Sequence, residues 1–320
     1  MKNNLQFTWE KLGLVLGELP NENWSKSHFQ FPAVYVSKNK IKVYITTRPD
    51  PEIDNKYVTY IRSFDLEINN GFEAFNFSKK PVLNLGPDGS FDQFGTMPGD
   101  IVEYGNKLYL FYTGWNRLDQ VPYNFSVGLA ISEDKGDTFE KFSEGPVIGQ
   151  TVNTPYTCGS GAVVFDNGIF HQFCISGIKW IKINNKLEHT YTIKHAISEN
   201  GVDWKFLKGN AINQKHEFEA IAAPTVIKIK ETYHMWFSYR ESVDFRGGKG
   251  SYRIGYAHSK DLIKWDRDDE RSGIDVSLTG WDSNMICYPY VFEFDKEIYM
   301  LYNGNDFGKD SLGIAKLKYL

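Results

Sequence analysis

The sequence lacks the features that mark several protein classes. Its 3 cysteines are an odd number without metal-ligand spacing, so we expect buried free thiols. Basic and acidic residues, 36 and 40 in number, are mixed along the chain and give a formal net charge of -4. Without a basic stripe, nucleic acid is not an expected partner. The 7 histidines also lack ligand spacing, and no metal or cofactor is expected.

Long hydrophobic runs are missing as well. The N-terminal stretch MKNNLQFTWEKLGLVL contains no continuous apolar segment and no small-residue cleavage site. We therefore expect no signal peptide, no membrane span and a cytoplasmic location.

Aromatic residues, in contrast, are abundant, at 16% of the chain. They favour strands and also line sugar-binding clefts, so both interpretations are open. A short strand, a tight polar turn and an aromatic second strand recur five times: PAVYVSKNKIKVYITTR, GDIVEYGNKLYLFYTGW, SGAVVFDNGIFHQFCIS, PTVIKIKETYHMWFSYR and PYVFEFDKEIYMLYNGN. A third strand and a short fourth strand follow, and the unit repeats about every 60 residues. This pattern predicts an all-β, five-bladed β-propeller with four antiparallel strands per blade, as a single domain over residues 1–320.

The fifth unit lacks a fourth strand of its own. The stretch FTWEKLG, from Phe7 to Gly13, resembles DTFEKFSEG, from Asp137 to Gly145. We infer that Trp9 begins the missing strand, so that the N-terminal segment closes the last blade and leaves no open edge there. A disordered tail is the alternative.

Polar residues that recur in every unit are expected to serve the scaffold. The stretch SEDKGDTFEKF, from Ser132 to Phe142, matches the Asp box known from sialidases, but it is repeated as a turn before the fourth strand. Four third strands carry an aligned serine, namely Ser63, Ser132, Ser198 and Ser259. Upstream of each first strand another aligned set recurs, namely Ser25, Asp92, Asn153, Glu217 and Asp282. Turn chemistry explains both sets, with Asp92 and Asp282 kept as reserve catalytic candidates.

Polar residues that occur in one unit only are better candidates for chemistry. Asp100 aligns with Ala33, Gly161, Thr225 and Tyr290, and Glu219 also departs from its aligned position. We expect both carboxylates to face a central cavity on the side of the long loops between second and third strands. One protonated and one ionised carboxyl group at such a cavity suit general acid and base catalysis at a glycosidic bond. The alternative for each is a carboxylate held by backbone N–H groups.

The expected substrate-binding residues are Arg48, Trp115, Lys194, Arg240 and Asn305. The arginines and Lys194 are candidates for gripping a carboxylate or phosphate, and Trp115 for stacking on a sugar face. Structural ion pairs are the alternative for Arg48 and Arg240.

The blade pattern, the Ser-x-Asp/Asn turns with a following tryptophan, the strand ends FYTGW and LYNGN and the prolines at strand starts resemble the five-bladed propellers of glycoside hydrolase family 43 and its relatives in families 32, 68, 117 and 130. The resemblance implies a carbohydrate-active enzyme, a hydrolase or a phosphorylase, with a sugar-containing partner. Family 43 enzymes carry Asp before the first-blade proline, where this chain has Phe31. They carry Glu near a later proline, where Ala222 and Ala223 precede Pro224. A non-catalytic glycan-binding propeller and a protein-interaction scaffold are the alternatives.

Overall fold

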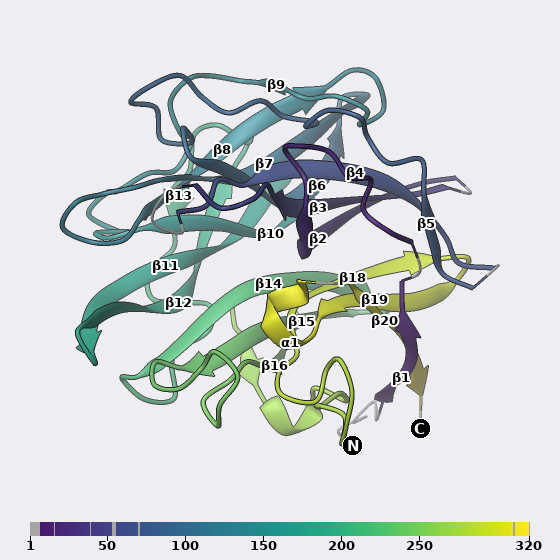
Figure 1. The fold of residues 1–320 in the computed structure, drawn as a ribbon. Helices are drawn as coiled ribbons and strands as arrows, with labels where there is room; N and C mark the ends of the chain where they lie inside the picture. Colours follow the sequence, from purple (N-terminus) through teal and green to yellow (C-terminus); the bar gives the residue numbers. More distant parts are fainter. Residues whose placement is uncertain are drawn as a thin grey trace.

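Five antiparallel sheets of four strands surround a central axis in the computed structural model (Figure 1), which describes residues 7–15, 17–38, 40–52, 56–69, 71–309 and 311–319. The predicted five-bladed all-β propeller is thus confirmed. The long loop expected between residues 48 and 56 lies partly outside the described residues. Within the described ranges, no helix has the length and apolar character needed to cross a membrane.

The strands follow the chain from the innermost to the outermost position of each blade. Blade 1 contains β2 (Ser27–Ser37), β3 (Lys40–Arg48), β4 (Tyr60–Glu67) and β5 (Glu73–Phe75). Blade 2 contains β6 (Gly95–Tyr104), β7 (Lys107–Asn116), β8 (Asn124–Ser132) and β9 (Glu140–Lys141). Blade 3 contains β10 (Cys158–Asp166), β11 (Ile169–Ile183), β12 (Lys186–Ser198) and β13 (Lys205–Phe206). Blade 4 contains β14 (Glu219–Ile229), β15 (Thr232–Glu241), β16 (Arg253–Ser259) and β17 (Asp266–Arg267), followed by the 3-10 helix η2 (Asp269–Arg271).

Blade 5 is built from both ends of the chain. It contains β18 (Cys287–Phe294), β19 (Glu297–Asn303), helix α1 (Asn305–Gly308), β20 (Gly313–Tyr319) and, as its outermost strand, β1 (Phe7–Leu14). Trp9 lies opposite Leu317 in this pairing, and Figure 1 shows purple β1 beside yellow β20. The predicted closure is confirmed, with the strand beginning at Phe7 rather than Trp9.

An ion pair fixes β1 in blade 5. Lys11 Nζ lies 2.7 Å from the buried carboxylate Oδ2 of Asp282, to which the Tyr302 hydroxyl donates a hydrogen bond of 3.1 Å. This contact joins the outermost strand to the segment before β18 and to β19.

The same arrangement occurs in blade 2. There Lys141 of β9 lies 2.6 Å from Asp92 Oδ2, and the Tyr112 hydroxyl donates to that oxygen at 2.8 Å. Asp92 and Asp282 therefore occupy equivalent buried positions, each held by a lysine of the fourth strand and a tyrosine of the second. Their surroundings fit the structural role expected from their repetition.

The Asp-box turns also belong to the scaffold. The Ser132 hydroxyl bonds to Asp134 Oδ1 at 2.7 Å and accepts the Gly136 amide at 2.8 Å, while Asp134 accepts the Thr138 amide at 3.0 Å. Ser198 with Asn200, and Ser259 with Asp261, repeat this pattern in blades 3 and 4.

Blade 1 does not share this turn, and the alignment of Ser63 was wrong. Leu108, the second residue of β7, pairs with Ser132, whereas Ile41, the second residue of β3, pairs with Leu66. Leu66 is thus the counterpart of Ser132.

In every blade the pairing of the innermost strand with the second strand shifts register at an equivalent position. The shifts lie between Gln30 and Ala33, Pro98 and Asp100, Gly159 and Ala162, Ala222 and Thr225, and Cys287 and Tyr290. In three blades the residue before the proline has a positive φ: 50° at Phe31, 48° at Ala223 and 53° at Tyr288. Residues with a side chain seldom adopt this left-handed conformation, and a bulge of this kind redirects side chains locally.

The core lies in the layers between neighbouring blades. Between blades 4 and 5, for example, Trp9 packs edge-on against Trp236 with ring centroids 5.3 Å apart, beside buried Tyr256 and Tyr302. Similar clusters separate the other blades. Much of the aromatic content therefore serves packing between sheets. The three cysteines are free and buried, as predicted.

Candidate functional site

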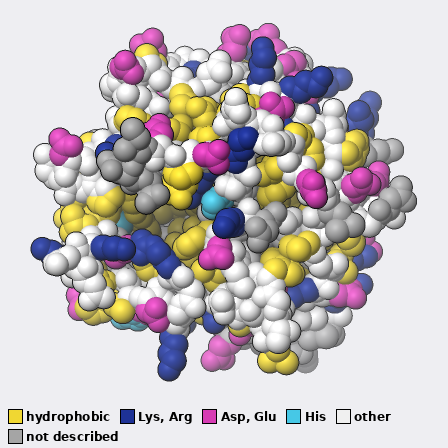
Figure 2. Space-filling view, viewed as in Figure 1, with side chains coloured by type: hydrophobic (Ala, Val, Ile, Leu, Met, Phe, Trp, Pro, Cys, Tyr) yellow, Lys and Arg dark blue, Asp and Glu magenta, His cyan; other side chains and the backbone are white. Residues whose placement is uncertain are grey.

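A cavity of about 950 Å³ opens on the face that carries the connections between second and third strands, here called the loop face. Every blade contributes to its wall through such a connection or the strand ends beside it. Figure 2 shows this face hollowed near its centre, with hydrophobic and basic side chains bordering the hollow.

The innermost strands form the floor of the cavity. Each supplies residues from the point of its register shift: Phe31, Pro98, Gly159, Ala222 and Tyr288. The Phe31 and Tyr288 rings are stacked, with centroids 3.8 Å apart and planes inclined by 18°. The floor is thus aromatic and apolar at the positions of the innermost strands where the resemblance to family 43 implies carboxylates.

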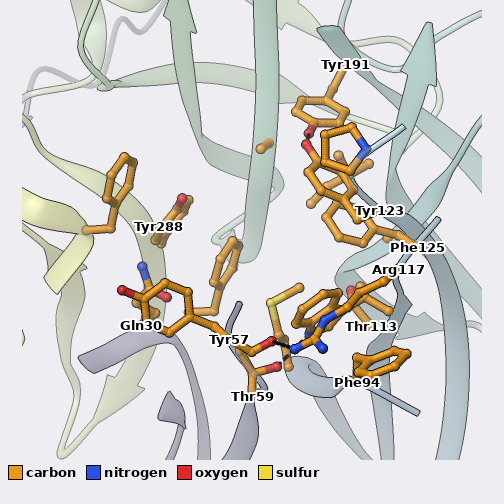
Figure 3. A pocket seen from close by; sticks show the side chains of 18 of the residues that line it. Gln30, Tyr57, Thr59, Phe94, Thr113, Arg117, Tyr123, Phe125, Tyr191 and Tyr288 are labelled. Atoms are coloured by element: carbon orange, nitrogen blue, oxygen red, sulfur yellow. Dashed lines mark hydrogen bonds between the residues drawn. The ribbon is translucent and has the colours of Figure 1, made fainter. Parts of the chain in front are cut away.

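Blades 1 and 2 form one wall, in which cations and aromatic rings alternate. Trp115, at the end of β7, donates from Nε1 to Thr59 Oγ1 at 2.8 Å. The Arg117 guanidinium lies 4.1 Å from the centroid of the Phe94 ring and donates to the Tyr57 carbonyl at 2.6 Å (Figure 3). These contacts fix the polar edges of the wall and leave ring surface toward the cavity.

Arg48 lies at the end of β3 in the same wall. Its Nη2 donates to Gln30 Oε1 at 2.7 Å, and its guanidinium lies 5.1 Å from the centroid of the Tyr57 ring. Burial lowers the pKa of this guanidinium from its ordinary value. Its Nε is buried and has no hydrogen-bond partner among the described residues.

Blades 3 and 4 form the opposite wall. Tyr191 of this wall is hydrogen-bonded through its hydroxyl to that of Tyr123, which comes from the β7–β8 connection of blade 2, and burial raises the pKa of Tyr123 to about 12 (Figure 3). Arg240, at the end of β15, is only 3% exposed. Its N–H groups donate to the Tyr252 hydroxyl, the Glu241 carbonyl and the His189 carbonyl at 3.1, 2.9 and 3.0 Å.

Two further wall residues escaped the sequence analysis. Glu188 of β12 is buried and forms a bidentate pair with Arg246, at 2.6 and 3.1 Å. Arg246 lies in the connection between β15 and β16. Its guanidinium is 4.1 Å from the centroid of the Phe245 ring, and the Arg240 guanidinium is 3.7 Å from the same centroid. The available signal in the sequence was a pair of opposite charges in the segments around the junctions of second and third strands in blades 3 and 4. Among the described wall residues, Asp119 is the other carboxylate.

The predicted catalytic carboxylates lie outside this wall and are not brought together. Asp100 follows the register shift of β6 and points toward other blades. It accepts hydrogen bonds from the Ile101 and Val163 amides, at 2.8 and 2.7 Å, and from the Tyr290 hydroxyl at 2.7 Å. Burial raises its pKa to about 6. These contacts link blade 2 to blades 3 and 5.

Glu219 is engaged in an ion network of blade 4. Its carboxylate is bidentate with Arg267 of β17, at 2.7 and 2.9 Å, and accepts the Lys215 amide at 2.7 Å. Arg267 also binds Asp269 at 2.8 Å. The expectation that Asp100 and Glu219 face a common cavity is not met, and a catalytic role for either stays a prediction.

The five predicted binding residues divide into two groups. Arg48, Trp115 and Arg240 line the cavity, whereas Lys194 and Asn305 do not. Asn305 fastens the loop before β18, since its Oδ1 accepts the Asn284 amide at 2.8 Å.

Lys194 replaces the glycine that other blades have at the aligned position, and the reason lies in the packing. Its counterpart Gly128 lies opposite Tyr112, whose ring would be 2.2 Å from a Cβ atom there. Lys194 lies opposite the smaller Cys174, so no glycine is needed, and its ammonium binds the Asn153 carbonyl. The described part of the chain contains no group of three or more His, Cys, Asp or Glu residues placed to hold a metal ion.

Two relatives match nearly the whole chain. The Mycobacterium tuberculosis proteins MT1551, from strain CDC 1551, and Rv1502 are both uncharacterized, and each is 31% identical over 312 residues, 97% of this chain and 99% of the relative. No protein-family model matches the chain.

Several solved structures share the fold at low sequence identity. A complex of BT0996 and RGII has a TM-score of 0.73 at 18% identity, with 98% of the present sequence and 92% of the matched protein covered. A second structure belongs to the GH130 family of mannoside phosphorylases, which contains glycoside hydrolases that target β-1,2 mannosidic linkages in Candida mannan. It has a TM-score of 0.70 at 15% identity, and the match covers 99% of the present sequence and 95% of the GH130 protein. A thermostable family-43 glycoside hydrolase has a TM-score of 0.64 at 15% identity, and the match covers 94% of the present sequence and 92% of the hydrolase. The protein is a five-bladed propeller similar in structure to these proteins.

Proposed function

Because this protein belongs to the same family as the uncharacterized mycobacterial proteins MT1551 and Rv1502, and shares its fold with glycoside hydrolases, we propose that it binds a saccharide in the loop-face cavity. The observation that carries this proposal is the composition of the cavity wall. Eleven aromatic side chains line it: Phe31, Tyr57, Phe94, Trp115, Tyr123, Phe125, Tyr191, Phe245, Tyr252, Tyr288 and Phe307. The volume of about 950 Å³ suits a small-molecule ligand.

Sugar rings and this wall are chemically complementary. The C–H faces of a pyranose are apolar and pack on aromatic rings, while its hydroxyls need hydrogen-bond partners at the ring edge. Trp115 lies opposite Phe125 in the pairing of β7 with β8, and the Phe125 ring is stacked on that of Tyr123 with centroids 4.6 Å apart. These rings of blade 2 line the cavity together with Tyr57 of blade 1, and Tyr191 and Tyr252 line it from blades 3 and 4. Gln30 and Thr113 supply polar groups to the cavity lining, the first near Tyr57 and the second near Arg117 (Figure 3).

The direct test is calorimetric titration of the protein with a panel of mono- and oligosaccharides. We expect saturable binding of at least one sugar, with an affinity that falls when Trp115 is replaced by alanine. Absence of binding across the panel would contradict the proposal and favour the protein-interaction scaffold.

Action on a glycosidic bond is the second candidate function, and the burial of Glu188 in the cavity wall favours it. The carboxylate is held by Arg246 in a fixed orientation, which suits a base or nucleophile. Asp119, exposed at the cavity rim, is the candidate to protonate the leaving oxygen. The likeness to the GH130 structure supports inclusion of phosphate as a co-substrate in the assay.

Turnover is measured by chromatography of oligosaccharides incubated with the protein, with and without inorganic phosphate. We expect Glu188→Gln to abolish product formation while sugar binding persists. Glu217→Gln is the matched control, because Glu217 is an exposed acid paired with Lys179 outside the cavity. If wild-type protein binds sugar but yields no product from any substrate, the glycan-binding function stands and the enzymatic one does not.

A further inference from the structure

Two arginines in the cavity wall have no acidic partner. Neither Arg48 nor Arg240 forms an ion pair with a carboxylate of the described part of the chain. The other two wall arginines differ in this respect, since Arg117 pairs with Glu52 and Arg246 with Glu188. A buried charge without a counter-charge is costly, so a protein seldom keeps one without a use for it.

The acceptors that these arginines do have are neutral. Arg240 donates to one hydroxyl and two backbone carbonyls, and Arg48 to the amide oxygen of Gln30. Three of the five N–H groups of Arg240 are thus used, and the buried Nε of Arg48 has no partner in the described structure. Donor capacity as well as charge remains available on both side chains.

The guanidinium groups of Arg48 and Arg240 line the same cavity. The Tyr288 hydroxyl, at the cavity floor, lies within electrostatic reach of each of them. His189, whose carbonyl accepts from Arg240, cannot supply charge of either sign: burial and the charge of Arg240 lower its pKa to about 3. Five basic residues line the cavity (Arg48, Lys56, Arg117, Arg240 and Arg246) against the two acidic residues Asp119 and Glu188.

We infer that the saccharide carries an anionic oxygen group, a carboxylate or a phosphate, and that Arg48 and Arg240 bind this group from opposite sides of the cavity floor. Guanidinium groups bind both anions through charge-assisted hydrogen bonds that are stronger than those between neutral groups. This inference rests on the proposed saccharide binding and specifies its substrate class.

The test compares charged sugars with their neutral parents by calorimetry. The probes are glucuronate and galacturonate for the carboxylate, glucose 1-phosphate for the phosphate, glucose and galactose as neutral parents, and inorganic phosphate alone. We expect at least one charged sugar to bind tenfold or more tightly than its neutral parent, with affinity that falls as sodium chloride is raised. Preference for the uronates or for the sugar phosphate then distinguishes the two sources of the anion.

Variants locate the effect. Arg48→Gln should weaken binding of the charged sugar at least tenfold and that of the neutral parent by a much smaller factor. Arg48→Lys, which keeps the charge but loses the fork, should lie between these values. Lys107→Gln, an equal change of net charge at an exposed pair with Glu133, should leave both affinities unchanged. Thermal melting verifies the folding of each variant, and the salt titration of the wild-type protein is independent of any variant.

Three results would overturn the inference. Equal affinity of charged and neutral sugars would refute it while leaving saccharide binding intact. Equal affinity of inorganic phosphate and glucose 1-phosphate would show an anion site that does not recognise the sugar. Absence of binding by any sugar would remove the proposed function together with the inference.

Discussion

Lys11 of the outermost strand and Asp282, ahead of the innermost strand, form a 2.7 Å ion pair that ties the two ends of blade 5 together. Asp282 is 2% exposed, so a neutral residue at position 11 would leave a buried carboxylate without its counter-charge. We expect Lys11→Met to lower the free energy of unfolding by about 2 to 3 kcal/mol in urea denaturation. Lys318→Met, which breaks the exposed pair with Glu10 on the same sheet, should cost less than about 1 kcal/mol. Equal losses would show that the Lys11 pair has no special role in closure.

The Asp-box turn gives a second prediction. Asp134→Ala removes the acceptor of the Thr138 amide and hydroxyl, bonds of 3.0 and 2.6 Å, and should cost about 1 to 2 kcal/mol of stability. The turn lies on the face opposite the cavity, so sugar affinity should not change. Glu133→Ala, at the exposed neighbouring position, should stay within about 0.5 kcal/mol of wild type. Lost sugar binding in Asp134→Ala would indicate a role beyond the scaffold.

Asp100 predicts an unusual pH dependence. Burial raises its pKa in the folded protein from 3.8 to about 6, so the folded state holds a proton that the unfolded state releases between these values. Its contribution to stability is present below about pH 4 and is lost as the pH rises through 6, by at most about 3 kcal/mol.

The measurement for Asp100 is urea denaturation of wild type and Asp100→Asn between pH 4 and 6. Other carboxylates change stability equally in both proteins, so the difference between the two curves reports Asp100. A constant difference over this range would contradict the prediction.

Trp115 gives a prediction for binding. Loss of its ring in Trp115→Ala should weaken the affinity for the bound sugar about tenfold, the equivalent of one aromatic contact of roughly 1.4 kcal/mol. Phe142→Ala is the control, because Phe142 is 50% exposed and lies outside the cavity wall. Equal calorimetric affinities for the Trp115 variant and wild type would exclude stacking on this residue.

The fold was predictable because equivalent residues in different blades make the same packing contacts. Aligned residues such as Asp92 and Asp282 meet the same lysine and tyrosine partners, so repetition in the sequence indicated repetition in space. Ser63 was misaligned because blade 1 continues β4 past the point where the other blades turn. A local sequence match cannot show the length of a strand whose end depends on its neighbours.

The site was harder to predict, because a residue can break a repeat for reasons of packing. Lys194 occurs where a small partner, Cys174, removes the need for glycine. Asp100 breaks its repeat to bond with Tyr290 and Val163 of other blades. In contrast, Glu188 lies near the start of β12, in the long β11–β12 hairpin, and Arg246 lies in the connection between β15 and β16, so no alignment with the other blades could identify them. Arg48 and Arg240 were found because strand ends keep their register up to the loop face.

The pairing of β1 with β20 also sets the order in which this protein can mature. Residues 7–14 are synthesised before every other described strand, yet their partner, residues 313–319, is synthesised after all of the others. Until β20 has been synthesised, the amide and carbonyl groups of β1 that bond to it must therefore remain without their native partner. Blades 1 to 4 can assemble in sequence, whereas completion of the ring is a single late event that joins the first and the last of the described strands.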